Sequence, residues 1–535
     1  MKYILIICLS AFLIQCTSGS KAPTDTFVFC SVGSPSSFNP QLATDGPSFN
    51  ASSSPIYNRL VEFEHGKTKL IPALAESWDI SEDAMTYTFR LREDVKFHTT
   101  DYFTPTRNMN ADDVIFSFMR QKDNSHPYHN VSGGLYKYFE SMGMGELIDS
   151  IKKIDEHTIV IQLTRPEAPF LANLAMDYAS ILSKEYADQL AAKDQHQQID
   201  QQPIGTGPFQ FKKYMKDSIV RFESHPAYFK GEPKIKKMVF SINTDASVRT
   251  QKLLNGECHL LNEPAPQDLE KIKASKQHKV ISAPGLNVGY LAFNTSKKPF
   301  DNKLVRQAIN HALNKDSYME AIYLNHATPA VNPLPPTIWS YNKQIQPYEY
   351  NLEKAKQLLK QAGHEKGFEA ELWTLPVSRP YNPNGKKMGE MMQADLAKIG
   401  IKVKLITYDW STYLDKTRKG EHDMAQLGWS GDNGDPDNFL NILLSCEAIE
   451  GGNNISKWCH KKYSQLVQKA RTETDIETRT KLYKQAQEIF HKEAPWAPIA
   501  HATVFKAMDK DLQGYKINPL SVEQFYPLFF GEESQ

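Results

Sequence analysis

The stretch GWSGDNGDPDN, residues 428–438, concentrates turn-forming and acidic residues in one short segment. Glycine, asparagine and aspartate at this density predict a loop rather than the interior of a helix or strand. Loops that carry concentrated chemistry are often binding sites. The segment therefore raises the question of what Asp432, Asp435 and Asp437 hold: a metal ion, a turn or a positively charged ligand.

The spacing of these aspartates does not fit a calcium loop. An EF-hand numbered from Asn433 would place Asn438 where glycine belongs and Leu444 where the bidentate glutamate belongs. We therefore expect Asp435 and Asp437 to cap backbone N–H groups in a turn.

Asp432 differs from its two neighbours because it follows Gly431 and lies close to Trp429, so its carboxylate could point into an apolar pocket. A buried carboxylate is costly unless it is paired with a cation. No cationic residue is present in the loop. A ligand ammonium would provide the missing charge.

A second candidate is Arg379, within VSRPYNPN at residues 377–384. It is followed by Pro380 and Tyr381. The guanidinium group is a rigid fork that suits a carboxylate. The alternative, an arginine in an ordinary surface loop, stays open from the residues alone.

Composition and motifs restrict the function. The chain has 535 residues, which predicts three or four domain-sized units, and its 62 Lys and Arg balance its 62 Asp and Glu, which gives no support for nucleic-acid binding. No G-x-S-x-G, Walker loop or H-E-x-x-H is visible. His126 and His129 flank Pro127 without a convergent acidic partner. We expect no catalytic residues, no metal and no cofactor.

The first twenty residues are typical of a secretory signal, with Lys2 before an apolar run at residues 4–14. Two endings stay open. LIQC, which ends at Cys16, is similar to a bacterial lipobox apart from Gln15, and SGS at residues 18–20 suits ordinary cleavage. Both endings predict export, either as a soluble protein or with a lipid tether on Cys16.

Four cysteines follow this segment: Cys30, Cys258, Cys446 and Cys459. They allow three disulfide connectivities. Cys446 and Cys459 close a short loop, which makes them the easiest pair to guess, and Cys30 with Cys258 would follow by elimination. None shows C-x-x-C spacing, so a zinc or redox site has little support.

Strand and helix patterns are mixed along the chain, which predicts the α/β class. Residues 86–92 alternate polar and apolar side chains, as a half-buried strand does. Asp301 or Asn302 can cap a helix whose apolar face ends at Ala312. A further helix is predicted from about residue 352 and ends at Gly363.

Longer motifs carry a resemblance to a known family. The chain resembles the periplasmic dipeptide-binding proteins of bacterial ABC importers in the stretches FNPQLATDG, YNRLVEF, PIGTGPFQ, PGLNVGYLAFN and GWSGDNGDPDNF. These proteins belong to the peptide, nickel and haem class of extracellular solute-binding proteins, family 5. The resemblance extends from about residue 26 to about residue 530.

The resemblance implies the large, peptide-binding type of the two-lobed periplasmic binding protein fold. Lobe I would comprise residues 25–284 plus 503–535, with an extra subdomain at about 57–206, and lobe II residues 285–502. The crossings between the lobes would be SAPGLNVGY and IAHATVF.

The same resemblance implies roles for individual residues. Asp432 would pair with the ligand's α-ammonium and Arg379 with its α-carboxylate. The remaining ligand contacts would be Trp429, Ser430, Gly431, Pro380, Tyr381 and, from the first lobe, Thr44. The disulfides of the family match Cys30–Cys258 and Cys446–Cys459.

The implied function is that of a non-enzymatic, monomeric substrate-binding subunit in the periplasm of a Gram-negative bacterium. It would capture dipeptides between its lobes and deliver them to an inner-membrane ABC permease and its ATPases. The alternative is a lipid-anchored haem- or glutathione-binding protein, whose relatives share stretches similar to KFHTTDYFTPTR at 96–107 and PLPPTIWSYN at 333–342. The Pro-Tyr after Arg379 and the last cysteine pair favour dipeptides. A secreted hydrolase would need a catalytic nucleophile paired with a general base, and the sequence shows no recognisable motif for such a pair.

Overall fold

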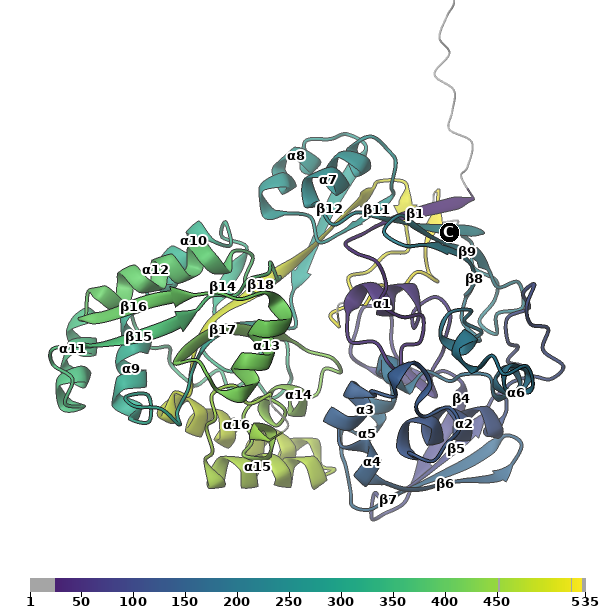
Figure 1. The fold of residues 1–535 in the computed structure, drawn as a ribbon, viewed down its shortest axis with the longest axis horizontal. Coiled ribbons are helices and arrows are strands. Elements are labelled where there is room, and N and C mark those ends of the chain that lie inside the picture. The colour runs from purple at the N-terminus through teal and green to yellow at the C-terminus, as the bar shows by residue number, and fades with distance from the viewer. Residues whose placement is uncertain (1–24, 451–452, 521, 532–535) are drawn as a thin grey trace, which may run out of the picture.

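The protein has two lobes that lie side by side (Figure 1) in a computed structural model that describes residues 25–450, 453–520 and 522–531. Helices and strands alternate in both lobes, which confirms the predicted two-lobed α/β fold. We call the part that holds α9 to α16 and β13 to β17 the second lobe, and the remainder, apart from β18, the first lobe. The predicted signal segment at residues 1–20, with Cys16, lies outside the described residues.

One twelve-stranded sheet runs through both lobes. Its main order is β16-β15-β17-β13-β18-β11-β1-β10-β9-β8, and β12 and β14 also pair with β18. In sheet order the strands are β16 (Ile401–Ile406), β15 (Phe368–Trp373), β17 (Met424–Ser430), β13 (Asn287–Phe293), β18 (Trp496–Asp509), β11 (Leu260–Asn262), β1 (Thr26–Ser31), β10 (Lys237–Ile242), β9 (Ile219–Ser224) and β8 (Phe209–Met215), with β12 (His278–Pro284) and β14 (Ala327–Pro329). All seven residues of β13 are buried, as expected for a strand covered on both faces.

A smaller antiparallel sheet lies in the first lobe, in the order β4 (Ala75–Ile80), β5 (Thr86–Leu91), β7 (Thr158–Leu163) and β6 (Ile148–Asp155). In β5 the side chains of Tyr87, Phe89 and Leu91 are buried, while Arg90 is exposed, so the strand predicted at 86–92 is confirmed. Two-stranded sheets pair β2 (Val61–Phe63) with β3 (Leu70–Pro72) and β19 (Leu512–Gln513) with β20 (Phe529–Phe530).

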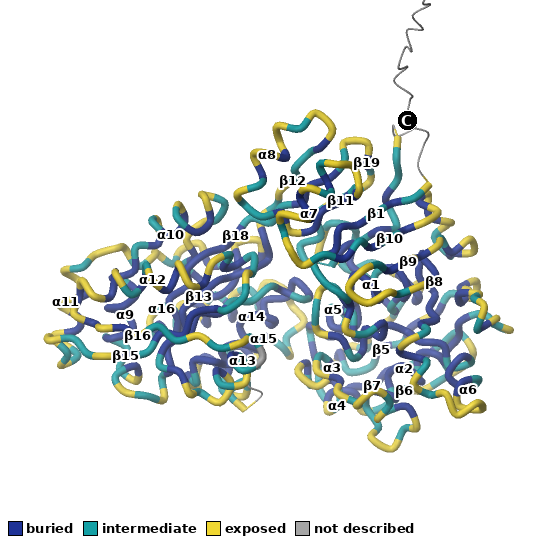
Figure 2. Tube along the Cα trace, turned by 45° about the horizontal axis from the view of Figure 1, so that its top comes forward, coloured by how far each residue is buried: buried dark blue, intermediate teal, exposed yellow. Residues whose placement is uncertain are grey.

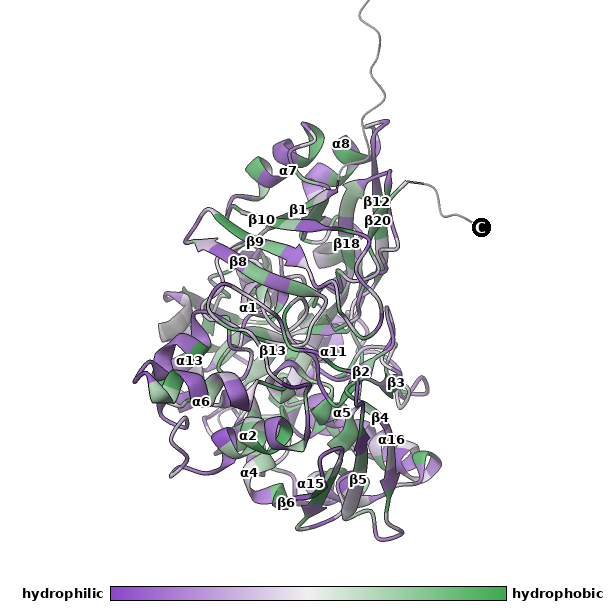
Figure 3. Cartoon of the chain, turned by 90° about the vertical axis from the view of Figure 1, so that its right-hand side faces the viewer, coloured by the Kyte–Doolittle hydropathy of each residue, from purple (hydrophilic) through white to green (hydrophobic). Residues whose placement is uncertain are grey.

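The helices of the first lobe are short. They are α1 (Gly46–Ala51), α2 (Ala111–Lys122), α3 (Lys137–Ser141), α4 (Met144–Leu147), α5 (Phe170–Leu174), α6 (Lys184–Ala192), α7 (Ala246–Leu254) and α8 (Leu269–Lys273). Two of the longer ones, α2 and α6, carry both hydrophobic and hydrophilic residues (Figure 3). Their apolar residues pack into the lobe, where Figure 2 shows a buried interior.

The helices of the second lobe cover its part of the sheet. They are α9 (Lys303–Ala312), α10 (Lys315–Ala321), α11 (Leu352–Gln361), α12 (Gly385–Ala397), α13 (Trp410–Lys419), α14 (Asp437–Leu440), α15 (Lys461–Thr472) and α16 (Ile476–Glu493). The cap of α9 is Asn302, whose side chain accepts from the Leu304 N–H at 2.9 Å. Gly363, two residues beyond α11, has a positive φ of 82°, as a residue that ends a helix commonly has.

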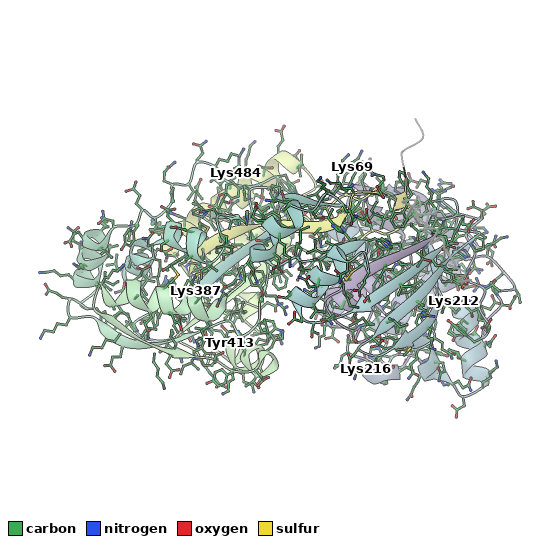
Figure 4. The ribbon with its side chains drawn as sticks, turned by 90° about the horizontal axis from the view of Figure 1, so that it is seen from above. Lys69, Lys212, Lys216, Lys387, Tyr413 and Lys484 are labelled. Atoms are coloured by element: carbon green, nitrogen blue, oxygen red, sulfur yellow. A yellow bond between two sulfur atoms is a disulfide. The ribbon has the colours of Figure 1, made fainter. Side chains whose placement is uncertain are left out.

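Strand β18 belongs to both lobes. Its first half, from Trp496 to Ala500, pairs with β13 of the second lobe. Its second half, from Thr503 to Asp509, pairs with β12, and part of it with β11, in the first lobe. The chain therefore passes between the lobes twice, once in β18 and once where β12 leads into β13, and the lobes lie on either side of these segments in Figure 4.

The buried side chain of Asn287 joins the two crossings. Its Nδ2 donates to the Ala502 carbonyl at 3.0 Å, and the Ala502 N–H donates to its Oδ1 at 2.9 Å. The Asn287 carbonyl lies 2.8 Å from Nδ1 of His501. These bonds fix the register of the crossings at the level of the lobe boundary.

Two disulfides are present, in the pairs that the sequence analysis expects. Cys30 is bonded to Cys258 in the first lobe, and Cys446 to Cys459 in the second. Cys30 and Cys258 are buried in a small apolar cluster with Leu253, Leu261 and Ile272. Among the described residues, no helix has the length and apolar composition that a membrane crossing requires.

Replacement of Asn287 by Ala tests the join between the crossings. The substitution leaves the buried N–H of Ala502 without its acceptor, which costs roughly 1–3 kcal/mol of unfolding free energy. Urea unfolding monitored by circular dichroism measures the change. The control is Asn255→Ala at an exposed position, where a change within about 0.5 kcal/mol is expected. Equal effects of the two substitutions would contradict the role of Asn287.

Candidate ligand-binding site

A cavity of about 470 Å³ lies at the boundary between the lobes. Most of its wall comes from the first lobe, including Thr44 before α1 and Arg59 before β2. The second lobe contributes Ser430, Gly431 and Asp432, at the end of β17 and the start of the loop that leads to α14. The cavity therefore opens where the acidic loop of residues 428–438 meets the first lobe.

Asp432 receives hydrogen bonds from both lobes. Its Oδ1 accepts from the hydroxyl of Tyr138, on α3 of the first lobe, at 3.2 Å, and its Oδ2 accepts from Nδ2 of Asn438 at 3.0 Å. Asn438 also orients the loop, since its Oδ1 accepts from the Asp432 N–H at 3.0 Å and from Nε1 of Trp429 at 2.9 Å. Asp432 forms no ion pair with any residue that the structure describes.

Burial raises the pKa of the Asp432 carboxyl to about 6. The hydrogen bonds from Asn438 and Tyr138 lower it, and the nearby carboxylate of Asp177 raises it further. The ionised form of Asp432 is therefore destabilised in this protein, and a cation in the cavity would stabilise it.

The other two aspartates of the loop are paired. Asp435 accepts the Asp437 N–H at 2.9 Å, which is the predicted turn capping. Both oxygens of Asp435 also accept from Nη2 of Arg479, on α16, at 2.9 Å. Nε of Arg471, on α15, lies 3.4 Å from Oδ1 of Asp437. The prediction of a simple turn was thus incomplete, because the cations come from helices far along the chain.

The same region joins the lobes. Nη2 of Arg471 donates to Oε1 of the buried Glu167, in the first lobe, at 2.6 Å, and the Arg471 carbonyl accepts from the Ala168 N–H at 2.6 Å. Asn433 donates to Oδ1 of Asn173 at 2.8 Å. The acidic loop is therefore held against the first lobe directly at Asn433 and, through Arg471, at Asp437.

Arg379 and its neighbours form a separate part of the boundary. The N–H and carbonyl of Arg379 exchange hydrogen bonds with Asn382 at 3.1 and 3.0 Å, which makes Arg379 to Asn382 a tight turn with Pro380 at its second position. The Arg379 guanidinium lies over the ring of Trp410, 5.1 Å from its centroid. Tyr381 is buried in the turn, and its carbonyl accepts from the hydroxyl of Tyr323 at 2.7 Å.

Glycine makes the position of Tyr381 possible. A Cβ on Gly428 would lie 2.2 Å from the Tyr381 ring, and one on Gly289 would lie 2.3 Å from the Tyr381 carbonyl oxygen. Gly428 and Gly289 face each other on β17 and β13. The turn that carries Arg379 thus packs directly on the strand that leads to Asp432.

The predicted site residues fall into two groups in this structure. Thr44, Ser430, Gly431 and Asp432 line the cavity. The residues that do not line it are Trp429, Arg379, Pro380 and Tyr381. Tyr138 and Asn438 were not predicted from the sequence, since a lone tyrosine and a lone asparagine carry no motif. No group of three or more His, Cys, Asp or Glu that could hold a metal exists in the described part of the chain.

Comparisons with known proteins identify the family of the chain. The model of the bacterial extracellular solute-binding proteins, family 5 (middle region), matches residues 69–451. The dipeptide-binding protein of Escherichia coli (strain K12) is 52% identical over 513 residues, or 96% of each chain. Heme-binding protein A of Haemophilus influenzae is 48% identical over 510 residues, or 95% of this chain and 93% of that protein.

A solved structure shares the fold over nearly the whole chain. The crystal structure of a dipeptide binding protein from Pseudoalteromonas sp. SM9913 in complex with Met-Leu superposes with a TM-score of 0.85 at 40% identity, and covers 95% of this chain and 100% of that one. The predicted two-lobed binding-protein fold is therefore confirmed.

Asp432→Asn and Asp435→Asn should change stability in opposite directions. The folded-state pKa of Asp432 lies above the ordinary 3.8, so the carboxyl stabilises the fold only at low pH, and this contribution is lost as pH rises through about 6. Asp432→Asn should therefore raise the melting temperature at about pH 7.5, and the gain should vanish near pH 4. Asp435→Asn breaks a buried ion pair and should cost several kcal/mol, about 3–5.

Thermal unfolding of the ligand-free protein at both pH values measures these effects. The two variants make the same chemical change three residues apart, so each is the control for the other. A lower melting temperature for Asp432→Asn at about pH 7.5 would show that its carboxylate stabilises the ligand-free fold, contrary to this account.

Proposed function

Because the chain belongs to family 5 of the bacterial extracellular solute-binding proteins, we propose that it is the substrate-binding subunit of an ABC importer and that its ligand is a dipeptide. The observation that carries the proposal is the carboxylate of Asp432. It lines the cavity between the lobes, accepts neutral hydrogen bonds, and has no ion-pair partner among the residues that the structure describes. A ligand ammonium satisfies this carboxylate.

In this proposal Arg379 binds the α-carboxylate at the other end of the ligand. Two observations support the assignment. Its guanidinium stacks on Trp410 and makes no ion pair with any described residue, and its turn packs through Tyr381 on the strand that leads to Asp432. Arg379 does not line the cavity in this structure, so the proposal requires further closure of the lobes about the two crossings.

A dipeptide is a zwitterion whose charged ends lie at a set distance. Fixed charges on Asp432 and Arg379 would measure that distance, because a longer peptide leaves one charge unpaired in a closed site. Trp429, Ser430 and Gly431 would line the ligand backbone, with Thr44 opposite them from the first lobe. Bridging water would accommodate varied side chains.

The remaining assignments form part of the same proposal. Lobe I comprises residues 25–284 and 503–535, with a subdomain at about 57–206, and lobe II residues 285–502. The ligand-bound protein acts in the periplasm of a Gram-negative bacterium, free or tethered through Cys16, as a monomer without enzymatic activity. It delivers the dipeptide to an inner-membrane permease and its ATPases.

A second candidate ligand is haem, because heme-binding protein A is among the relatives at 48% identity. Haem carries carboxylates but no ammonium. Its binding would therefore depend less on Asp432 than dipeptide binding would. Glutathione, which carries an α-ammonium, would depend on Asp432 as a dipeptide does.

Calorimetric titration tests the proposed ligand. The ligands are Ala-Ala, its C-terminal amide, Ala-Ala-Ala, glutathione and haem. Asp432→Asn should weaken Ala-Ala binding by more than about 100-fold, since loss of one partner of a buried ion pair costs roughly 3–5 kcal/mol. Arg379→Lys and the amide should both weaken binding, because an ammonium or an uncharged end cannot form the bidentate pair.

The control is Asp415→Asn, an aspartate whose exposed side chain pairs with Lys419 on α13, which should bind Ala-Ala like the parent. Binding by Asp432→Asn within a factor of about ten of the parent would refute the ammonium role. Equal affinity for Ala-Ala and its amide would refute the role of Arg379. Tripeptide binding as tight as that of Ala-Ala would assign the protein to a broader peptide class.

A further inference from the structure

The side chain of Arg59 differs from the buried arginines of the first lobe. It lines the cavity, and only 17% of its side chain is exposed. The nearest acidic group is Asp177, whose Oδ1 is 3.6 Å from Nη1, and within the described residues the Arg59 side chain makes no hydrogen bond. Arg120, in contrast, donates to the Tyr128 carbonyl and to both oxygens of Asp200.

Such a guanidinium is an incomplete binding group. It has five N–H donors, and a largely buried donor without a partner loses its hydration without compensation. Asp177 cannot complete it, because its carboxylate lies beyond hydrogen-bond distance and already accepts from the hydroxyl of Ser53. The other cation of the cavity wall, Lys230, is bonded to Glu62.

Arg59 shares the cavity with Asp432. Asp177 links the two, since it is paired with Arg59 and its negative charge also acts on Asp432. A peptide whose ammonium binds Asp432 therefore has its first residue, not its last, on the side of Arg59. The cavity wall also includes Phe49, Tyr57 and Tyr138, whose rings can contact the aliphatic part of a side chain.

We infer that Arg59 forms a carboxylate-binding subsite in this cavity, which selects peptides whose first residue is acidic. The inference rests on the proposed function, because it takes Asp432 as the ammonium site. One guanidinium can serve both Asp177 and a ligand carboxylate, since its donors lie on two edges of a plane. The ligand ammonium and Arg59 then provide two positive charges. They face three negative charges, on Asp432, Asp177 and the ligand side chain, so the net charge of the group is −1.

The test compares four dipeptides that differ in one group: Ala-Ala, Glu-Ala, Gln-Ala and Ala-Glu. Calorimetric titrations use the parent, Arg59→Gln and Lys69→Gln. Lys69→Gln is the matched control, because it removes one positive charge from an exposed position in the β2–β3 hairpin, outside the cavity wall (labelled in Figure 4). Thermal unfolding of each variant verifies that it is folded.

We expect the parent and Lys69→Gln to bind Glu-Ala at least about ten-fold tighter than Gln-Ala and Ala-Glu, as a charge-assisted pair provides. Arg59→Gln should remove this preference, so that it weakens Glu-Ala binding at least about ten-fold more than Gln-Ala binding. In addition, Arg59→Lys should recover part of the preference, which a purely structural role of Arg59 would not produce.

Two outcomes would overturn the subsite alone. In one, the parent binds Ala-Ala but prefers Glu-Ala no more than Gln-Ala. In the other, Arg59→Gln weakens Ala-Ala and Glu-Ala equally, which would mean that Arg59 holds the terminal carboxylate or the fold. A parent that binds none of the four dipeptides would overturn the proposed function and the subsite together.

Discussion

Compensation of buried negative charge is the constraint on which the boundary between the lobes depends. Asp435 and Asp437 lie in a loop without cations, and Glu167 is buried in the opposite lobe. Arg479 on α16 pairs with Asp435, and Arg471 on α15 pairs with Glu167 and lies 3.4 Å from Asp437. Because an isolated carboxylate in such a place would cost several kcal/mol, the two helices and the loop can be buried only together.

Asp432 differs from these carboxylates because no described arginine or lysine forms an ion pair with it. The loop around it is fixed by the paired aspartates and by Asn438, so its carboxylate cannot turn away to solvent without the loss of those bonds. Burial raises the pKa of Asp437 as well, to about 7, but Asp437 lies next to Arg471, whereas Asp432 has no ion-pair partner among the described residues. In the proposed function, a buried carboxylate of this kind would bind a complementary charge more tightly, and stability would be given up for affinity.

Local pattern in the sequence predicted much of the fold. The alternation at residues 86–92, the cap and apolar face of α9 and the turn composition of the acidic loop are each determined by near neighbours in the chain. Asp432 could be selected because one loop held several carboxylates and no cation. A resemblance of long motifs then supplied the two-lobed arrangement.

The partners of that loop could not be predicted in this way. Tyr138 meets Asp432 across 294 positions of sequence, and Arg471 meets Glu167 across 304. Neither contact leaves a periodic or spaced pattern, because it is created by the docking of two lobes that are each built from distant segments. Arg59 was missed for the same reason, since its lack of hydrogen-bond partners is visible only when the whole wall of the cavity is in place.

The strand shared by the two lobes also sets an order of assembly. The sheet of the first lobe pairs β1, near the start of the described chain, through β11 with the last residues of β18, which ends at Asp509. During synthesis, which starts at the N-terminus, the first lobe cannot be completed until the second half of β18 has been made. The second lobe needs only the first half of β18, which is made earlier. The first lobe is therefore the first to begin folding and the last to be completed. Until then the edge of β11 lacks its partner strand, and such an open edge is prone to aggregation.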